Sequence, residues 1–195
     1  MPDDPQIDAL KLPPHSIEAE QSVLGGLLLD NEAADRIGDV VSAPDFYSDA
    51  HRIIFDHVAR LIGDGRPADA VTVAESLSSA GRLEHVGGLA YLGALVQSVP
   101  SAANVRHYAQ IVRDRSVLRQ LASTAAEIAE SAYQPMGRNA AQLLDEAETK
   151  VMHIAEAGSR GRKQYEKIGD LLTGVVERIE ELFNREHPTD VTGLA

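Results

Sequence analysis

The feature that most constrains the fold is a pair of heptad repeats separated by a turn, in the second half of the chain. In residues 102–132, apolar side chains fall at heptad positions, with Asp114 as the single polar interruption: Ile111, Leu118, Leu121, Ala125, Ile128 and Ala132. In residues 139–156 the same spacing is kept by Ala140, Leu144, Ala147, Val151 and Ile154. A repeat of 3.5 residues is the seam of two packed helices, so residues 100–157 are predicted to form an antiparallel helical hairpin.

The two arms of this hairpin can cover each other's seam, but they do not account for every apolar side chain. Four residues lie off the seam and are expected to stay exposed on an isolated hairpin: Val112, Val117, Leu143 and Met152. Burial against something outside the hairpin is therefore expected. The residues predicted to build the hairpin and its self-association surface are Val112, Val117, Leu118, Leu121, Ile128, Leu143, Leu144, Val151 and Ile154.

Residues 13–99 carry the signals of a compact helical head. Ser16 is predicted to cap a helix that reaches about residue 29, and Thr72 with Glu75 forms a predicted capping box. The pair Gly25-Gly26 inside the first helix indicates either the close approach of another helix or a kink. No stretch alternates convincingly as a strand would, so the expected fold is all-α, with a compact multi-helix head, a long antiparallel helical hairpin and a separate amphipathic linker helix.

Both ends of the chain differ from this folded part. Residues 1–12 resemble a disordered lead-in, and the basic residues 158–167 are predicted to be a flexible linker, an interpretation favoured over a phosphate-binding site. Residues 168–186 are predicted to form the linker helix, whose apolar stripe would dock on another domain. That stripe consists of Leu172, Val175, Val176, Ile179, Leu182 and Phe183. Residues 187–195 are expected to begin a connection to a further domain.

Composition excludes several classes of function. The chain has no Cys, which excludes disulfides and Cys-ligated metals, and it has neither an apolar run that would span a bilayer nor an export signal, so a cytoplasmic protein is expected. Its net charge is −12, and residues 1–104 hold 16 acidic and 6 basic side chains. Tight binding of nucleic acid by this chain is not expected, because such affinity depends on Lys and Arg at phosphates.

No catalytic, cofactor or metal site can be assembled from the motifs. A G-x-x-x-x-G-K-[ST] phosphate loop does not occur in the 195 residues. His51 and His57 are six residues apart on one predicted helix and so make poor joint metal ligands. The acidic residues Asp145, Glu146 and Glu148 are expected to be a solvated helix face. The chain itself is therefore not expected to be an enzyme.

Several short motifs resemble the N-terminal part of the DnaB-type replicative DNA helicases, in the same order. They are LPP at 12–14, EAEQSVLGG at 18–26, DFY at 45–47 followed by His51 and IF at 54–55, VGGLAYL at 86–92, PSAAN at 100–104 and YAQIVR at 108–113. The resemblance extends from about residue 12 to the C-terminus. None of these motifs is catalytic, and their specificity comes from their occurrence together.

The resemblance implies a collar domain whose hairpins pair into dimers, with the dimers assembling into a hexameric ring. It also implies recruitment of primase, docking of the linker helix on the ATPase domain of the neighbouring subunit, and the use of ATP and Mg²⁺ by that domain of the parent protein. In the family, the ATPase domain would begin just after residues 191–193, whereas this sequence ends at Ala195. A truncated chain without helicase activity of its own is therefore expected.

Two other functions remain open at this point. A free-standing helical adaptor or inhibitor of a replication complex would share the collar's sequence pattern without belonging to a helicase. An enzyme with a carboxylate–His site in the acidic head is the second alternative, and bound metal or nucleotide hydrolysis would favour it.

Overall fold

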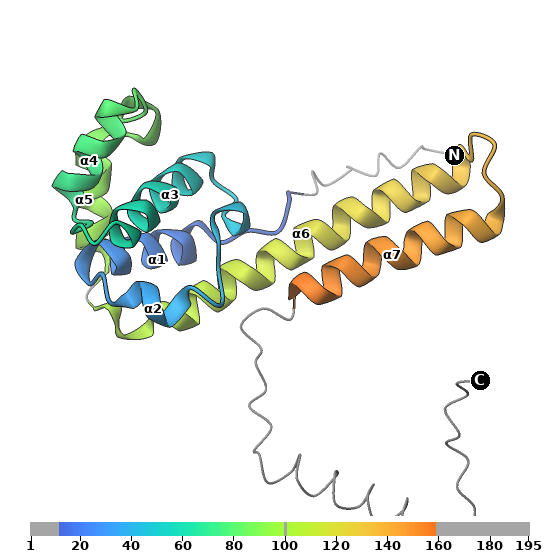
Figure 1. The fold of residues 1–195 in the computed structure, drawn as a ribbon, viewed down its shortest axis with the longest axis horizontal. Helices are drawn as coiled ribbons and strands as arrows, with labels where there is room; N and C mark the ends of the chain where they lie inside the picture. The colour runs from blue at the N-terminus through green and yellow to red at the C-terminus, as the bar shows by residue number, and fades with distance from the viewer. Residues whose placement is uncertain (1–11, 100, 159–195) are drawn as a thin grey trace, which may run out of the picture. The chain divides into compact units, whose positions relative to one another are not determined.

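The computed structural model describes residues 12–99 and 101–158, and these form helices, turns and short connections without a strand. The all-α fold expected from the sequence is thus confirmed (Figure 1). The elements in chain order are α1 (Ile17–Leu29), α2 (Ala33–Ile37), the 3₁₀ turn η1 (Ala43–Asp45), α3 (Asp49–Gly63), α4 (Ala70–Ser79), η2 (Glu84–Val86), α5 (Gly88–Ser98), η3 (Ala102–Asn104), α6 (Val105–Tyr133) and α7 (Ala140–Gly158).

Helix α1 lies at the centre of the head, which we define as α1 to α5 together with residues 102–112. It contacts α3, α5 and α6. A Cβ atom at Gly25 would lie 2.2 Å from the carbonyl oxygen of Leu95 in α5, and one at Gly26 would lie 3.2 Å from Cγ2 of Val105 in α6. The glycine pair therefore permits two helices to approach α1 closely, and α1 runs through it as a continuous helix.

The helix ends follow local capping chemistry, with one correction. Ser16 accepts a hydrogen bond from the backbone N–H of Ala19, as predicted. The capping box of α4, however, is formed by Asp69 and Thr72, so Thr72 occupies the third helical position and is not the cap. Asp69 accepts from the N–H groups of Val71 and Thr72 at 2.8 Å. The prediction from Thr72 was wrong because the acidic residue three positions earlier offers the stronger acceptor.

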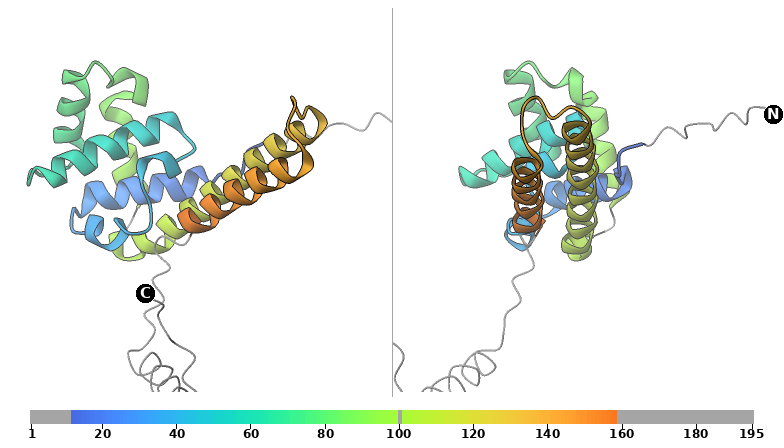
Figure 2. Two further views of the ribbon diagram at one scale, coloured as in Figure 1. Left: turned by 45° about the vertical axis from the view of Figure 1, so that its right-hand side comes forward. Right: turned by 90° about the vertical axis from the view of Figure 1, so that its right-hand side faces the viewer.

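Helix α6 belongs to two parts of the fold. Its first turns pack into the head, where Val105, Ala109 and Val112 are buried in the same hydrophobic core as α1. Its remaining turns leave the head and run antiparallel to α7 (Figure 1), and the two further views show these arms side by side (Figure 2). We call residues 117–158 the hairpin. Asn139 caps its second arm by accepting from the N–H of Gln142 at 2.9 Å, as predicted.

Candidate protein interface on the hairpin

The arms of the hairpin touch along a line of mostly small or branched side chains. Half-buried residues on α6 include Val117, Thr124, Ile128 and Ser131, and those on α7 include Leu143, Ala147, Lys150 and Ile154. Val117 lies against Gly158 at the end of α7, where a Cβ atom would be 3.7 Å from the valine Cγ2. The short side chains Thr124, Ser131 and Ala147 allow the two helices to approach each other closely.

A second face of the hairpin is apolar and open to solvent. Leu118 and Leu121 of α6 are 44% and 46% exposed, and Leu144 and Val151 of α7 are 65% and 46% exposed. A groove of about 390 Å³ between the arms is lined by the heptad residues Ile128, Ala132, Ala140 and Leu144, together with Glu146 and Lys150 among others. We call Leu118, Leu121, Leu144 and Val151 the apolar face.

Another side of the hairpin is polar. Nζ of Lys150 donates to Oε2 of Glu127 at 2.8 Å, and this hydrogen bond lowers the pKa of Glu127 below its ordinary value. The surface around the pair is lined by Gln120, Ser123, Thr124 and His153. Because charge gathers on this side, the hairpin is amphipathic as a unit, and the apolar face is the surface that a partner would cover.

The structure corrects the expected position of the heptad seam. Val112 is 1% exposed in the core of the head, and Val117 and Leu143 lie between the arms, so these three residues are not exposed as predicted. Met152 is 61% exposed, as expected. The reason lies in α6, which turns Val105, Ala109 and Val112 toward the head and an adjacent face toward α7. The larger aliphatic side chains at the heptad positions are therefore exposed to solvent: Leu118, Leu121, Leu144 and Val151.

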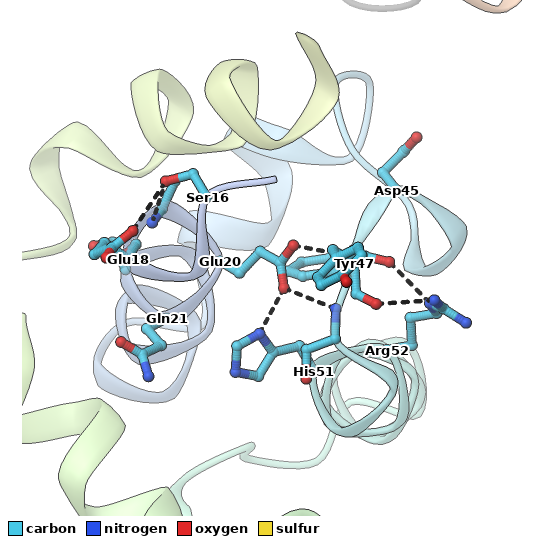
Figure 3. Close-up of polar contacts among 12 residues, drawn as sticks. Ser16, Glu18, Glu20, Gln21, Asp45, Tyr47, His51 and Arg52 are labelled. Atoms are coloured by element: carbon cyan, nitrogen blue, oxygen red, sulfur yellow. Dashed lines mark hydrogen bonds and ion pairs between the residues drawn. The ribbon is translucent and has the colours of Figure 1, made fainter. Parts of the chain in front are cut away.

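The head contains a buried network of polar side chains that sequence reasoning missed (Figure 3). Figure 3 shows the side chain of Glu20 reaching from α1 toward His51 of α3. Its carboxylate accepts from the N–H of Tyr47 at 2.7 Å, from the N–H of Ser48 at 3.2 Å and from Nδ1 of His51 at 2.6 Å. Nε2 of His51 in turn lies 2.6 Å from the hydroxyl of Tyr91 in α5.

The electrostatics of this network favour an ionised Glu20. Burial acts to raise the pKa of this carboxyl, but the hydrogen bonds from His51 and from the N–H groups of Tyr47 and Ser48 outweigh it, and the pKa lies below its ordinary value. Glu20 is 1% exposed and His51 is 2% exposed. A carboxylate and an imidazole that are sealed in this way join α1, α3 and α5 and have no open side toward a substrate. We therefore interpret the group as a structural link.

Titratable residues elsewhere in the head form no metal centre within the part of the chain that the structure describes. No group of three or more His, Asp or Glu side chains is placed there to hold an ion. Nδ1 of His57 lies 2.8 Å from the hydroxyl of Ser76, and burial followed by the nearby Arg60 lowers the pKa of His57 below its ordinary value. His51 and His57 thus serve separate contacts, as their spacing indicated.

Two arginines of α6 were also missed by sequence reasoning. Arg113 is 3% exposed and forms a buried ion pair with Asp45 of η1, whereas its neighbour Asp114, the expected interruption of the seam, is exposed. Arg119 donates to the backbone carbonyls of Pro14 and Asp45, and its guanidinium lies 5.7 Å from the centre of the Tyr47 ring. Their spacing from Val105, Ala109 and Val112 on the head-facing side of α6 was the available signal.

The stripe predicted for the linker helix lies outside the described residues. It comprises Leu172, Val175, Val176, Ile179, Leu182 and Phe183. Within residues 12–99 and 101–158, no helix has both the length and the apolarity required to cross a membrane.

The family model and the similar sequences all belong to DnaB-type replicative helicases. A family model described as the DnaB-like helicase N-terminal domain matches residues 12–114. The replicative DNA helicase DnaB of Buchnera aphidicola subsp. Baizongia pistaciae is 41% identical over 191 residues, which are 98% of this chain and 41% of the relative. The DnaB of Pasteurella multocida is 41% identical over 184 residues, covering 94% of this chain and 39% of the relative. The chain thus spans about two fifths of the length of these relatives.

Solved structures agree with the sequence comparisons. The crystal structure of the N-terminal domain of DnaB helicase from Mycobacterium tuberculosis matches with a TM-score of 0.69 and 39% identity, covering 72% of this chain and 99% of that one. A DnaB-like replicative helicase, solved in a study of its interactions with primase, matches with a TM-score of 0.61 and 24% identity, covering 92% of this chain and 37% of that one. At this identity the second match supports the fold.

Proposed function

The chain belongs to the family of DnaB-like helicase N-terminal domains, and on that premise we propose that it is the self-associating collar of a replicative DNA helicase. The observation that carries the proposal is the apolar face, where two leucines of α6 and a leucine and a valine of α7 are 44–65% exposed. A surface of this kind on a domain without a membrane-crossing helix among its described residues is best explained by a protein partner.

A second hairpin is the partner that this face fits best. Leu118 and Leu121 are three residues apart and Leu144 and Val151 are seven apart, so all four lie at heptad positions, and an identical face can interdigitate with them. Contact through the same patch on both copies gives a closed dimer with twofold symmetry. Fully burying such side chains contributes roughly 1.5–3 kcal/mol each, and four from each copy would provide much of the affinity for a dimer that can grow toward a hexamer.

Other parts of the proposal concern partners outside the hairpin. Primase is a proposed partner because the chain shares its fold with a helicase that was solved in a study of its interactions with primase. The linker helix with the stripe from Leu172 to Phe183 would dock on the ATPase domain of the neighbouring subunit. ATP and Mg²⁺ would act in that domain of the parent enzyme, which would unwind DNA at the replication fork in the cytoplasm. With its net charge of −12, the collar itself would not hold nucleic acid tightly.

The self-association proposal is tested by placing a charge on the apolar face. Leu121→Glu and Val151→Glu are expected to convert the dimer, or the dimer growing toward a hexamer, into a monomer, because each would bury an unpaired carboxylate. Light scattering over a wide range of protein concentration measures the molar mass. Ala126→Glu and Thr149→Glu are the matched controls, since both residues are exposed on nearly the opposite sides of the same helices. They should leave the mass unchanged.

Two results would contradict the proposal. A wild-type chain that is monomeric at every concentration would show that the apolar face serves a different partner. A dimer that survives both Leu121→Glu and Val151→Glu would place the contact elsewhere on the molecule.

A further inference from the structure

The point where α6 leaves the head is held by a single buried guanidinium. Arg113 is 3% exposed, and its two terminal nitrogens donate in different directions. One donates to the carboxylate of Asp45 in η1, and the other donates to the backbone carbonyl of Ala157 in the last turn of α7. One side chain of α6 therefore bonds both to the head and to the end of the hairpin.

The η1 turn depends on α6 for its position. Asp45 is 2% exposed, and its second carboxylate oxygen accepts from the N–H of Ser42 at 2.8 Å and from the hydroxyl of Ser42 at 2.9 Å. The backbone carbonyl of Asp45 accepts from Arg119 at 2.5 Å. Arg113 thus holds this turn through the side chain of Asp45, and Arg119 holds it through the backbone carbonyl of Asp45.

The last described turn of α7 supplies the second acceptor of Arg113, the backbone carbonyl of Ala157. The final four carbonyls of a helix have no intrahelical donor and carry the negative end of the helix dipole. A guanidinium at the carbonyl of Ala157 forms a charge-assisted hydrogen bond near this end of α7. Nε of Arg113 is buried without a hydrogen-bond partner, so compensation of this buried cation depends on Asp45 and Ala157.

We propose that Arg113 couples the last turn of α7 to the η1 turn of the head, so that order in one is transmitted to the other. If residues 155–158 lose their helical structure, Arg113 loses the carbonyl of Ala157 and shifts to find a new acceptor, and its bond to Asp45 loosens. A partner that orders or unwinds the end of the hairpin would in this way change the surface of the head. This coupling operates within one chain and does not depend on self-association.

The proposal is tested by loosening the end of α7 without touching the head. In the double variant Ala155→Gly/Ala157→Gly, the carbonyl of residue 157 remains but the helical turn is weakened. Hydrogen exchange measured by mass spectrometry should show faster exchange at residues 154–158 and also about tenfold faster exchange at residues 43–47, which are far away in sequence. The amides of Asp45, Phe46 and Tyr47 are hydrogen-bonded, so their protection can be measured.

Two comparisons make the test specific to Arg113. Ala140→Gly/Ala141→Gly weakens the opposite end of α7 by the same chemistry and should leave exchange at residues 43–47 unchanged. In an Arg113→Lys background, which keeps the charge but loses the two-pronged guanidinium, the double glycine at 155 and 157 should add nothing further at residues 43–47. Unchanged exchange there in the 155/157 variant, or an equal effect with and without Arg113, would overturn the coupling.

Discussion

Glu20 of α1 and His51 of α3 lie 2.6 Å apart, from Oε2 to Nδ1, and both side chains are only 2% exposed. This pair joins the central helix of the head to the segment that follows η1, and through Tyr91 it reaches α5. Because the carboxylate only accepts hydrogen bonds, Nδ1 of His51 is the donor. The hydroxyl of Tyr91 accepts from the side-chain amide of Gln21 at 3.2 Å and lies 2.6 Å from Nε2 of His51.

The lowered pKa of Glu20 predicts a loss of stability in acid. Because the folded-state pKa lies below the ordinary value of 4.5, the unfolded chain binds a proton more readily, and stability should fall as the pH drops below about 4.5. Glu20→Gln removes this titration and is expected to cost about 1.5–3 kcal/mol near neutral pH, because charge-assisted hydrogen bonds are lost. Urea denaturation at pH values from 7 to about 3 measures both effects.

The exposed first-turn residue Glu18 provides the control for this prediction. Glu18→Gln removes a carboxylate from the same helix turn without disturbing a buried network, so the acid loss of stability should persist. If Glu20→Gln follows the wild-type pH dependence below pH 4.5, the ionised carboxylate contributes nothing to the stability of the head.

His57 is expected to produce a second loss of stability as the pH falls, in a pH range that begins above the range for Glu20. Its folded-state pKa lies below the ordinary value of 6.5, first because of burial and then because of Arg60, so the unfolded chain takes up the proton more readily. The contribution is present above about pH 6.5 and is lost as the pH falls through the folded-state pKa. His57→Gln retains a polar partner for Ser76 and should flatten this part of the stability profile. His153→Gln, at an exposed position, should leave the pH dependence of stability unchanged. Equal pH dependence of stability for the two variants would refute the prediction.

Gly25 and Gly63 should respond in opposite ways to replacement by alanine. A Cβ atom at Gly25 would lie 2.2 Å from a backbone oxygen of α5 and 2.8 Å from Val99, so Gly25→Ala is expected to cost about 1–3 kcal/mol through overpacking. Gly63, the last residue of α3, has no atom within 4 Å of that position. Gly63→Ala should therefore be neutral, or stabilising by a few tenths of a kcal/mol. Equal urea midpoints for the two variants would mean that α1 and α5 are not closely packed in solution.

The positions of the helices along the chain could be predicted because caps and glycine pairs are local features of the sequence. Ser16 and Asn139 cap helices with their own neighbours, and the glycine pair at 25 and 26 indicated a close approach that the structure places at Leu95 and Val105. The Thr72 capping box failed for an equally local reason, since Asp69 is a better acceptor three residues earlier. Such features depend on a few adjacent residues, so one sequence is enough to infer them.

The polar network and the orientation of the seam could not be predicted in this way. Glu20 was interpreted as a first-turn acid that favours the helix dipole, but its partners Tyr47 and His51 are 27 and 31 positions away along the chain. The heptad pattern grouped Leu118, Leu121, Leu144 and Val151 but did not show which face of α6 the head would occupy. That choice follows from packing against α1, a contact between distant parts of the chain.

The buried pair of Arg113 and Asp45 offers the sharpest test of how the head is joined to the hairpin. Each side chain is 3% exposed. Arg113→Met would leave the Asp45 carboxylate buried without its cation, and removing one member of such a pair costs roughly 3–5 kcal/mol. The double variant Arg113→Met/Asp45→Asn removes both charges, so its cost should be smaller than the sum of the two single costs.

The exposed pair Arg36–Asp30, with N and O 2.6 Å apart and side chains 43% and 39% exposed, is the matched control. Arg36→Met should cost only about 0–1 kcal/mol, because solvent screens that pair. Urea denaturation of the five chains measures the free energies of unfolding. Additive effects at Arg113 and Asp45, or a cost no larger than that of Arg36→Met, would mean that the two charges do not hold the hairpin to the head.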